Sequence, residues 1–322
     1  MRIFRFLPGH LPVLAGVEEI STSKQASEFF WLDIERSETD WHNKSYAWLK
    51  TPLHDRHLQD TLNDTHPPYY DGTDDYDLLV VRALCPDCPP EAPNTRPIAF
   101  ILTDNAVISI RFPGDPVFSK LHKRFLDAQR NSPTSVAMLL YLLLDQITNT
   151  LLAPRDNISE LLSRWQERLL DRNDVFNDWQ ALMRLRGQLR RLEVVSENQL
   201  DTIVEWREQT GLVVDSALAV RFNDLQEHLR RVYNHALVVQ QDIDALVQVY
   251  FSSNTQRTNE ILQFLTILSA VFLPLNLLAG LFGMNFTHLP LLQLWYGPWL
   301  LLGVMLIIVI GLLVWFRRKR WI

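Results

Sequence analysis

An uncharged segment near the C-terminus restricts the fold of this chain more than any other feature. From Ile261 to Phe316 there is no Asp, Glu, Lys or Arg. This segment is too long for a core element of a soluble protein, and a helix needs about 20 apolar residues to cross the hydrocarbon core of a bilayer. We therefore predict two transmembrane helices, over residues 261–285 and 297–316, joined by a loop over 286–296.

The flanks of these spans predict their orientation. The chain ends in a basic tail over 317–322, and basic residues next to a span stay on the cytoplasmic side. Two spans then place the large N-terminal part in the cytoplasm as well, and the loop on the periplasmic side of a bacterial inner membrane. Interfacial aromatic residues are expected at both ends of the second span, and they are Trp295, Tyr296, Trp299, Trp315 and Trp321.

The charge of the N-terminal part excludes some function classes. Residues 1–260 hold all 37 acidic residues and 27 of the 31 basic ones, a net charge of −10. An acidic surface argues against nucleic acid as a partner and suits a surface that meets cations. The sequence has no nucleotide-binding loop, nucleophile elbow or zincin motif, so we expect neither an enzyme nor a bound cofactor. Two cysteines are too few for a disulfide framework, which favours a reducing compartment.

Two kinds of pattern divide the cytoplasmic part, and together they predict an α+β fold. Residues 1 to about 112 are mixed α/β, and a helix opens near Pro52. Strands are expected at 29–34, 77–82, 98–102 and 107–110. From Pro116 onward the apolar spacing is helical, and helices are expected over 116–130, 133–154, 155–170 and 175–210. We take 1–215 as one cytoplasmic domain.

The last cytoplasmic helix is predicted to continue into the membrane. No proline falls between Pro154 and Pro274, so a helix that begins near Ala217 can run through a stalk over 216–260 into the first span. It would hold about 65 residues and measure on the order of 100 Å at 1.5 Å per residue. A helix of that length needs partners, so we infer an oligomer in which long helices pack side by side.

The first span carries small and polar residues on one side. Positions that step alternately by three and four residues share one face of a helix, and they are Asn259, Leu262, Thr266, Ser269, Leu273, Asn276, Gly280 and Gly283. One interpretation is a face for packing against other membrane helices, because small residues let helices approach closely. The other interpretation is the lining of a pore shared by several copies.

Asn276 favours the pore. A primary amide in the middle of a membrane is costly unless it meets water or a partner. One amide per copy would form a ring of carbonyl oxygens, which suits a hard, hydrated cation such as Mg²⁺. Leu262 and Leu273, with Leu265 beside the stripe, would then form apolar constrictions that gate by dewetting.

The first span ends in Gly283-Met284-Asn285, some 30 residues before the basic C-terminus. Together with Phe272-Leu273-Pro274-Leu275 and Ala279-Gly280-Leu281-Phe282, this motif resembles the CorA magnesium-transporter superfamily. Upstream, Asp60-Thr61-Leu62 and the run Asp74-Asp75-Tyr76-Asp77-Leu78-Leu79 are similar to the cytoplasmic domain of that family. The resemblance implies a funnel-shaped homopentamer that transports divalent metal cations across a lipid membrane.

The resemblance also implies roles for single residues. Gly283, Met284 and Asn285 would form the outer selectivity ring that touches the hydrated ion. The pore-lining positions of the family fall on Thr258, Asn259, Leu265, Leu273, Asn276 and Gly280. Magnesium members sense the ion at a cytoplasmic site between subunits that is built from Asp residues. Asp87 falls near one half of that site, and the other half falls on Asp224 or, in a second alignment, on Arg231.

The transported ion has two candidates. The complete Gly-Met-Asn motif favours Mg²⁺, with Co²⁺ or Ni²⁺ as further substrates. The loop after it reads Phe286-Thr287-His288-Leu289-Pro290 and has no acidic residue, which, with the Gly-Leu-Phe-Gly run, looks like the ZntB branch that imports Zn²⁺. A Zn²⁺ importer coupled to protons is therefore the alternative, and a non-conducting cation sensor or scaffold is a remote third.

Three other groups have the residue types of metal sites. They are Cys85 with Cys88, His54 and His57 with Asp60 and Asp64, and His228 with His235. The two cysteines lack a second ligand pair nearby, which favours a plain loop. For His54 and His57 we expect solvated helix residues rather than ligands, and for His228 and His235 we expect packing or surface residues.

Overall fold

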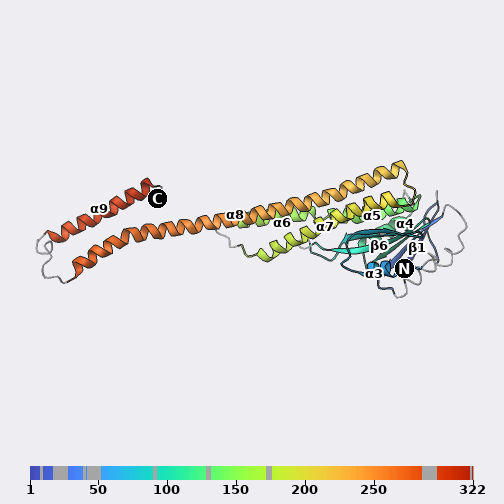
Figure 1. The fold of residues 1–322 in the computed structure, drawn as a ribbon, viewed down its shortest axis with the longest axis horizontal. Coiled ribbons are helices and arrows are strands. Elements are labelled where there is room, and N and C mark those ends of the chain that lie inside the picture. Colours follow the sequence, from blue (N-terminus) through green and yellow to red (C-terminus); the bar gives the residue numbers. More distant parts are fainter. Residues whose placement is uncertain are drawn as a thin grey trace. The chain divides into compact units, whose positions relative to one another are not determined.

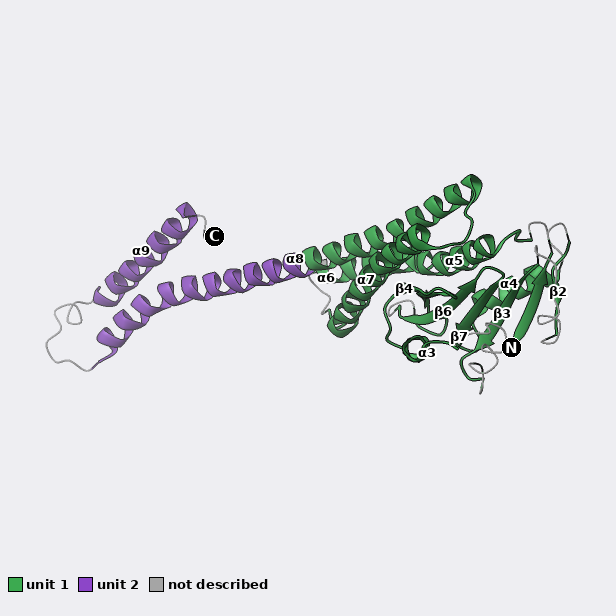
Figure 2. Ribbon diagram, turned by 45° about the vertical axis from the view of Figure 1, so that its right-hand side comes forward, with its two compact units in different colours: residues 1–246 green, residues 247–322 purple. Residues whose placement is uncertain are grey.

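The computed structural model describes residues 1–7, 10–16, 28–38, 41, 52–89, 93–127, 132–171, 176–284, 296–319 and 321. The chain divides into two compact units, Met1–Leu246 (unit 1) and Val247–Ile322 (unit 2), which Figure 2 colours separately. Helix α8 (Ser216–Gly283) contributes to both units. The helix that the sequence predicts from near Ala217 into the first span is therefore confirmed.

Unit 1 is built on a seven-stranded mixed sheet with the strand order β2-β1-β3-β7-β6-β5-β4. Neighbouring strands are antiparallel, except that β3 and β7 are parallel. The strands are β1 (Arg2–Phe6), β2 (Val13–Leu14), β3 (Phe29–Glu35), β4 (Tyr69–Gly72), β5 (Asp77–Leu84), β6 (Thr95–Thr103) and β7 (Ala106–Arg111). Each of the four strands predicted by range lies within one of these.

Alternate residues of β3 point to opposite faces of the sheet, as the twofold period of a strand requires. Phe30 and Leu32 enter a hydrophobic core against which α3 (Asp55–Leu62) packs through Leu58. Trp31 points to the other face, where its ring lies 6.1 Å from that of Phe118 on α4 (Pro116–Leu126). Because both faces of the sheet are covered at this strand, β3 carries apolar residues on both of its faces.

Helices α4, α5 (Val136–Leu152), α6 (Arg155–Leu170) and α7 (Trp179–Gln209) follow the sheet in sequence. Capping side chains mark the starts of α4 and α5. The Asp115 carboxylate accepts a hydrogen bond from Val117 N at 2.8 Å, with Pro116 in the first turn of α4, and Ser135 Oγ accepts from Met138 N at 3.1 Å. Helix α4 ends at Leu126, four residues before the predicted end, and α7 begins four residues after the predicted start. Figure 1 shows α5 and α7 on the side of the sheet opposite to α3.

Within unit 1, α7 and the first part of α8 run antiparallel. Arg186 Nε lies 2.7 Å from Asp244 Oδ1, and Arg207 Nη1 donates to Asn223 Oδ1 at 2.8 Å. The later residue of α7 therefore contacts the earlier residue of α8. Both helices bury apolar residues at steps of three and four, which is the pattern of helices that pack along their length. In α7 these residues include Leu182, Leu185, Leu189 and Leu192.

Unit 2 contains the end of α8 and α9 (Gly297–Arg318), which folds back along it. Gln263 Nε2 donates a hydrogen bond to the Trp321 carbonyl at 2.9 Å, so the end of the chain returns to the start of the predicted first span. In the part of the chain that the structure describes, three helical stretches are long and apolar enough to cross a membrane. The stretch in Val136–Leu169 is 56% buried within the fold, against 0% for α8 and 6% for α9. The first stretch is therefore part of the core of unit 1, whereas the apolar surfaces of α8 and α9 are free to contact lipid.

Candidate functional site

The stripe, defined as the eight positions from Asn259 to Gly283 given above, is exposed along its whole length on α8. With about 100° of rotation per residue, these positions lie within about 60° of a common direction. The less exposed residues of the same segment lie about 80° to 200° away from it. They include Gln263, Ile267, Ala270, Pro274, Leu278 and Phe282. Helix α9 thus covers a different side of α8 and leaves the stripe free.

The lower part of the stripe forms an open, largely apolar groove. Its volume is about 510 Å³, and its lining residues are Leu262, Leu265, Thr266, Ser269, Ala270, Leu273 and Pro274. Leu273, one of the leucines predicted to form the apolar gate, is 70% exposed within the chain. In a bilayer so open an apolar surface must be covered by lipid or by another protein segment.

The polar side chains of the stripe differ in whether their own helix satisfies them. Thr266 Oγ1 donates to the Leu262 carbonyl at 2.7 Å, and beside the stripe Thr258 Oγ1 donates to the Asn254 carbonyl at 3.0 Å. These hydroxyls need no further partner. The Asn276 amide is exposed and has no hydrogen-bond partner among the described residues. In a bilayer it requires water or a group from outside the chain.

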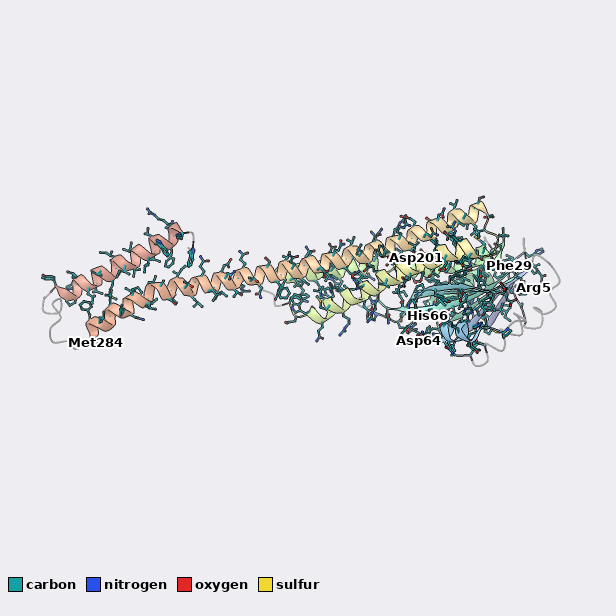
Figure 3. All side chains as sticks on the ribbon, viewed as in Figure 1. Arg5, Phe29, Asp64, His66, Asp201 and Met284 are labelled. Carbon is teal, nitrogen blue, oxygen red and sulfur yellow. The ribbon has the colours of Figure 1, made fainter. Side chains whose placement is uncertain are left out.

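The upper end of the stripe is open as well. A Cβ added at Gly280 or Gly283 would meet nothing within 4 Å, so packing within the chain does not require glycine at either position. Met284, labelled in Figure 3, is 53% exposed just after α8 ends. Asn285 and His288 lie outside the described residues. Of the predicted selectivity ring, the structure describes Gly283 and Met284.

The predicted sensing residues have exposed carboxylates. The Asp87 side chain is 81% exposed, and its Oδ2 lies 3.8 Å from Arg96 Nη2. Asp224 is 61% exposed, and its Oδ2 lies 3.7 Å from His228 Nε2. Sequence reasoning did not single out Asp145, which interacts electrostatically with Asp224. Burial and the charge of Asp224 raise the pKa of Asp145, and His228 offsets part of that rise. A site between subunits built on Asp87 and Asp224 stays a prediction.

The other candidate groups are not arranged as metal sites. His57 is buried rather than solvated, because its Nδ1 lies 2.9 Å from Tyr76 Oη and its Nε2 lies 3.0 Å from Asp71 Oδ2. The expectation of a solvated residue was therefore wrong for His57. Burial and the neighbouring Cys85 raise the pKa of Cys88 to about 11, so the thiolate needed for metal binding is scarce. Among the described residues no group of three or more His, Cys, Asp or Glu could hold a metal ion.

Sequence reasoning also missed a buried polar network in unit 1. Arg111 donates to Asp33 through Nε at 2.9 Å and through Nη2 at 2.7 Å, and His122 Nε2 lies 3.0 Å from the same carboxylate. Ser109 Oγ donates to Asp33 at 2.9 Å and accepts from Trp31 Nε1 at 3.0 Å. Burial raises the pKa of Asp33, but the contacts with His122 and Arg111 outweigh burial and hold it below its usual value.

These features define a class of protein. A folded α+β unit precedes two apolar helices that the chain itself leaves uncovered, and one of them carries a continuous small and polar stripe. This combination defines an integral-membrane protein with a candidate ion pathway.

Comparison with known proteins identifies the family. Residues 26–318 match the family described as CorA-like Mg²⁺ transporter protein, so the chain belongs to this family of divalent-cation transporters. It is 24% identical over 271 residues to the cobalt/magnesium transport protein CorA of Thermotoga maritima, covering 84% of this chain and 77% of that one. It is also 24% identical over 297 residues to the zinc transport protein ZntB of Klebsiella pneumoniae, covering 87% and 85%.

The fold is that of a solved relative. The complete structure of the CorA magnesium transporter from Methanocaldococcus jannaschii matches with a TM-score of 0.82 at 19% identity, covering 100% of this chain and 99% of that one. The predicted fold, an N-terminal mixed-sheet part whose long last helix continues into a C-terminal apolar hairpin, is confirmed.

Proposed function

We propose that several copies of this chain surround a water-filled axis and conduct hydrated Mg²⁺ through it, with Co²⁺ or Ni²⁺ as further substrates. The observation that carries the proposal is the orientation of the stripe. It is exposed on the side of α8 that α9 does not cover, and the Asn276 amide on it has no partner among the described residues. Turned toward a shared axis, these amides would hydrogen-bond the water shell of an ion that dehydrates reluctantly.

The remaining parts of the proposal follow from this axis. The assembly is a homopentamer in a bacterial inner membrane, with 1–215 and the stalk 216–260 in the cytoplasm, spans at 261–285 and 297–316, a periplasmic loop at 286–296 and a cytoplasmic tail at 317–322. Leu265 and Leu273 form the apolar gate, and the Gly-Met-Asn segment forms the outer ring. Four basic residues over 317–320 support a cytoplasmic C-terminus.

The alternative ion is Zn²⁺. It is supported by the similarity to the zinc transport protein ZntB over nearly the whole chain and by the uncharged loop after the Gly-Met-Asn motif. In that case we expect transport to depend on a proton gradient. The pore and its lining would be the same, and only the ion and the driving force would differ.

Ion flux into proteoliposomes tests the proposal. Liposomes loaded with a Mg²⁺ dye or a Zn²⁺ dye are compared for the wild type, Asn285→Ala, Asn276→Leu and the control Ala279→Leu. Ala279 is exposed and lies about 100° from the common direction of the stripe, so its replacement should leave flux unchanged. We expect Mg²⁺ flux in the wild type and the control, and loss of flux or of ion selectivity in the two Asn variants.

Two other outcomes would overturn parts of the proposal. Zn²⁺ flux that requires a pH gradient, without Mg²⁺ flux, would replace Mg²⁺ by the alternative. Background flux of both ions in the wild type and in Asn285→Ala would favour a non-conducting sensor or scaffold.

A further inference from the structure

Unit 1 contains a large open cavity that the transport proposal does not use. Its volume is about 1220 Å³, and it lies between the β5–β6 side of the sheet and one face of α7. The segment after α3, where Asp64 is labelled in Figure 3, forms part of its rim. Sites for small molecules in proteins usually enclose about 300 to 1,000 Å³, so this cavity has room for a ligand of nucleotide size.

The charge of the cavity lining is opposite in sign to the net charge of residues 1–260. Its lining includes four arginines and a single acidic residue, Asp64, a net charge of +3, whereas residues 1–260 together carry −10. The Asp64 carboxylate is already engaged, because Arg36 Nη1 donates to it at 2.6 Å. No carboxylate of the lining is therefore left to neutralise the four guanidinium groups.

Two of the arginines have no partner in the described part of the chain. Arg190 and Arg191 are exposed on α7 and make no hydrogen bond or ion pair there. Arg96 on the opposite wall lies 3.8 Å from the exposed Asp87 carboxylate, and its guanidinium carbon is 5.4 Å from the centre of the Phe112 ring. Arg82, in contrast, is used structurally, because its guanidinium donates to Thr95 Oγ1 at 2.8 Å and to the Thr95 carbonyl at 2.6 Å.

The face of α7 that lines the cavity is also shaped for close approach. Gly187 lies one turn before Arg190 and Arg191 on that face. A Cβ added at Gly187 would meet nothing within 4 Å, so packing does not require glycine there. Glycine inside a helix costs about 1 kcal/mol relative to alanine. A ligand lying against the helix at this point gives that glycine a function.

We propose that this cavity binds an anion with several phosphate groups. Guanidinium groups bind phosphate oxygens with paired, charge-assisted hydrogen bonds, and facing arginines on two walls suit a chain of phosphates rather than one carboxylate. Apolar residues, among them Pro67, Pro97 and Val194, line the rest of the cavity and leave room for an organic group. The ligand is therefore either an inorganic polyphosphate or the triphosphate of a nucleotide. This site is independent of the ion pathway on α8.

Calorimetric titration of the full-length protein in detergent micelles tests the proposal. Tripolyphosphate, ATP and adenosine are each titrated at low ionic strength in the presence of a chelator, which removes divalent cations that would bind the phosphates. We expect saturable binding of both triphosphates, none of adenosine, and weaker binding as salt is raised. ATP binding more tightly than tripolyphosphate identifies a nucleotide as the ligand, and equal affinity identifies the phosphate chain alone.

Matched variants assign the binding to the cavity. In Arg190→Gln/Arg191→Gln we expect the Kd to rise by about tenfold or more, since hydrogen bonds to charged groups are lost. The control Arg164→Gln/Arg184→Gln removes two exposed arginines that do not line the cavity and should leave the Kd unchanged. Arg96→Gln tests the opposite wall if the double variant fails to fold. Absence of saturable triphosphate binding in the wild type, or an equal loss in the control, would overturn the proposal.

Discussion

Replacing Asp33 by Asn should destabilise unit 1 far more than the same change at the surface. The side chains of Asp33 and Arg111 are only 1% and 6% exposed, and they are joined by three hydrogen bonds of 2.9, 3.1 and 2.7 Å. The substitution leaves the buried guanidinium with Glu35 alone as a counter-ion, whose side chain is 36% exposed and whose Oε1 lies 3.2 Å from Arg111 Nη1. Removing one partner of a buried pair typically costs about 3 to 5 kcal/mol. Because about 1.4 kcal/mol corresponds to a factor of ten, the opening of the sheet should become about 10² to 5 × 10³ times more frequent.

Hydrogen–deuterium exchange of the full-length protein measures this effect directly. Backbone amides of β3 and β7 exchange when the sheet opens, so their protection reports the free energy of that opening. The matched control is Asp244→Asn, which breaks the exposed pair with Arg186, with side chains 55% and 48% exposed. Exposed pairs contribute about 0.2 to 1 kcal/mol. A free-energy change of that size alters the exchange rate by about fivefold or less, which is the effect we expect in the control. Equal effects in the two variants would refute the reasoning from burial.

Three further predictions concern acid, the core and the pore. Because the pKa of Asp33 is lowered in the folded protein, its contribution is complete above the unfolded value of about 3.9 and is lost as the pH falls through the folded value. Protection of β3 should thus fall below about pH 4 in the wild type, and a wild-type profile that matches Asp33→Asn would contradict this. Leu189→Ala, at a fully buried position of α7, should cost about 2 to 5 kcal/mol, measured as a shift in urea midpoint; the control Val194→Ala, 44% exposed, should cost less than 1 kcal/mol. Gly280→Leu should block ion flux in proteoliposomes while Ala279→Leu does not, because only the first adds bulk to the stripe; unaltered flux in both would argue against a narrow pore there.

Patterns with a period of two or of 3.6 residues were enough to predict the main elements from sequence. The strand at Phe29 to Ile34 was predicted because its residues are apolar and β-branched or aromatic, and α8 because no proline interrupts it before the membrane. β4 (Tyr69–Gly72) was not predicted, since four residues with a glycine and an aspartate have no clear periodicity. Helix ends were misplaced by up to four residues, because periodicity does not mark the residue at which a helix begins or ends.

Sites that join distant parts of the chain were beyond pattern reasoning. Asp33 and Arg111 are 78 residues apart and meet only because β3 and β7 are parallel neighbours, which no local signal shows. A charged residue inside an otherwise apolar strand was the available signal for Asp33. The arginine cavity likewise combines β5, β6 and α7. The stripe could be predicted, in contrast, because it lies on one helix and follows from spacing alone.

Accessibility of single cysteines tests the water-filled axis most directly. In a background in which Cys85 and Cys88 are replaced by Ala, Gly280→Cys and Ala279→Cys lie at the same depth on α8 but about 100° apart. A charged, membrane-impermeant thiol reagent is applied to each variant in proteoliposomes. We predict that the cysteine at 280 reacts and that its modification blocks ion flux, while the cysteine at 279 is protected by lipid. Protection at 280 together with reaction at 279 would contradict the pore proposed here.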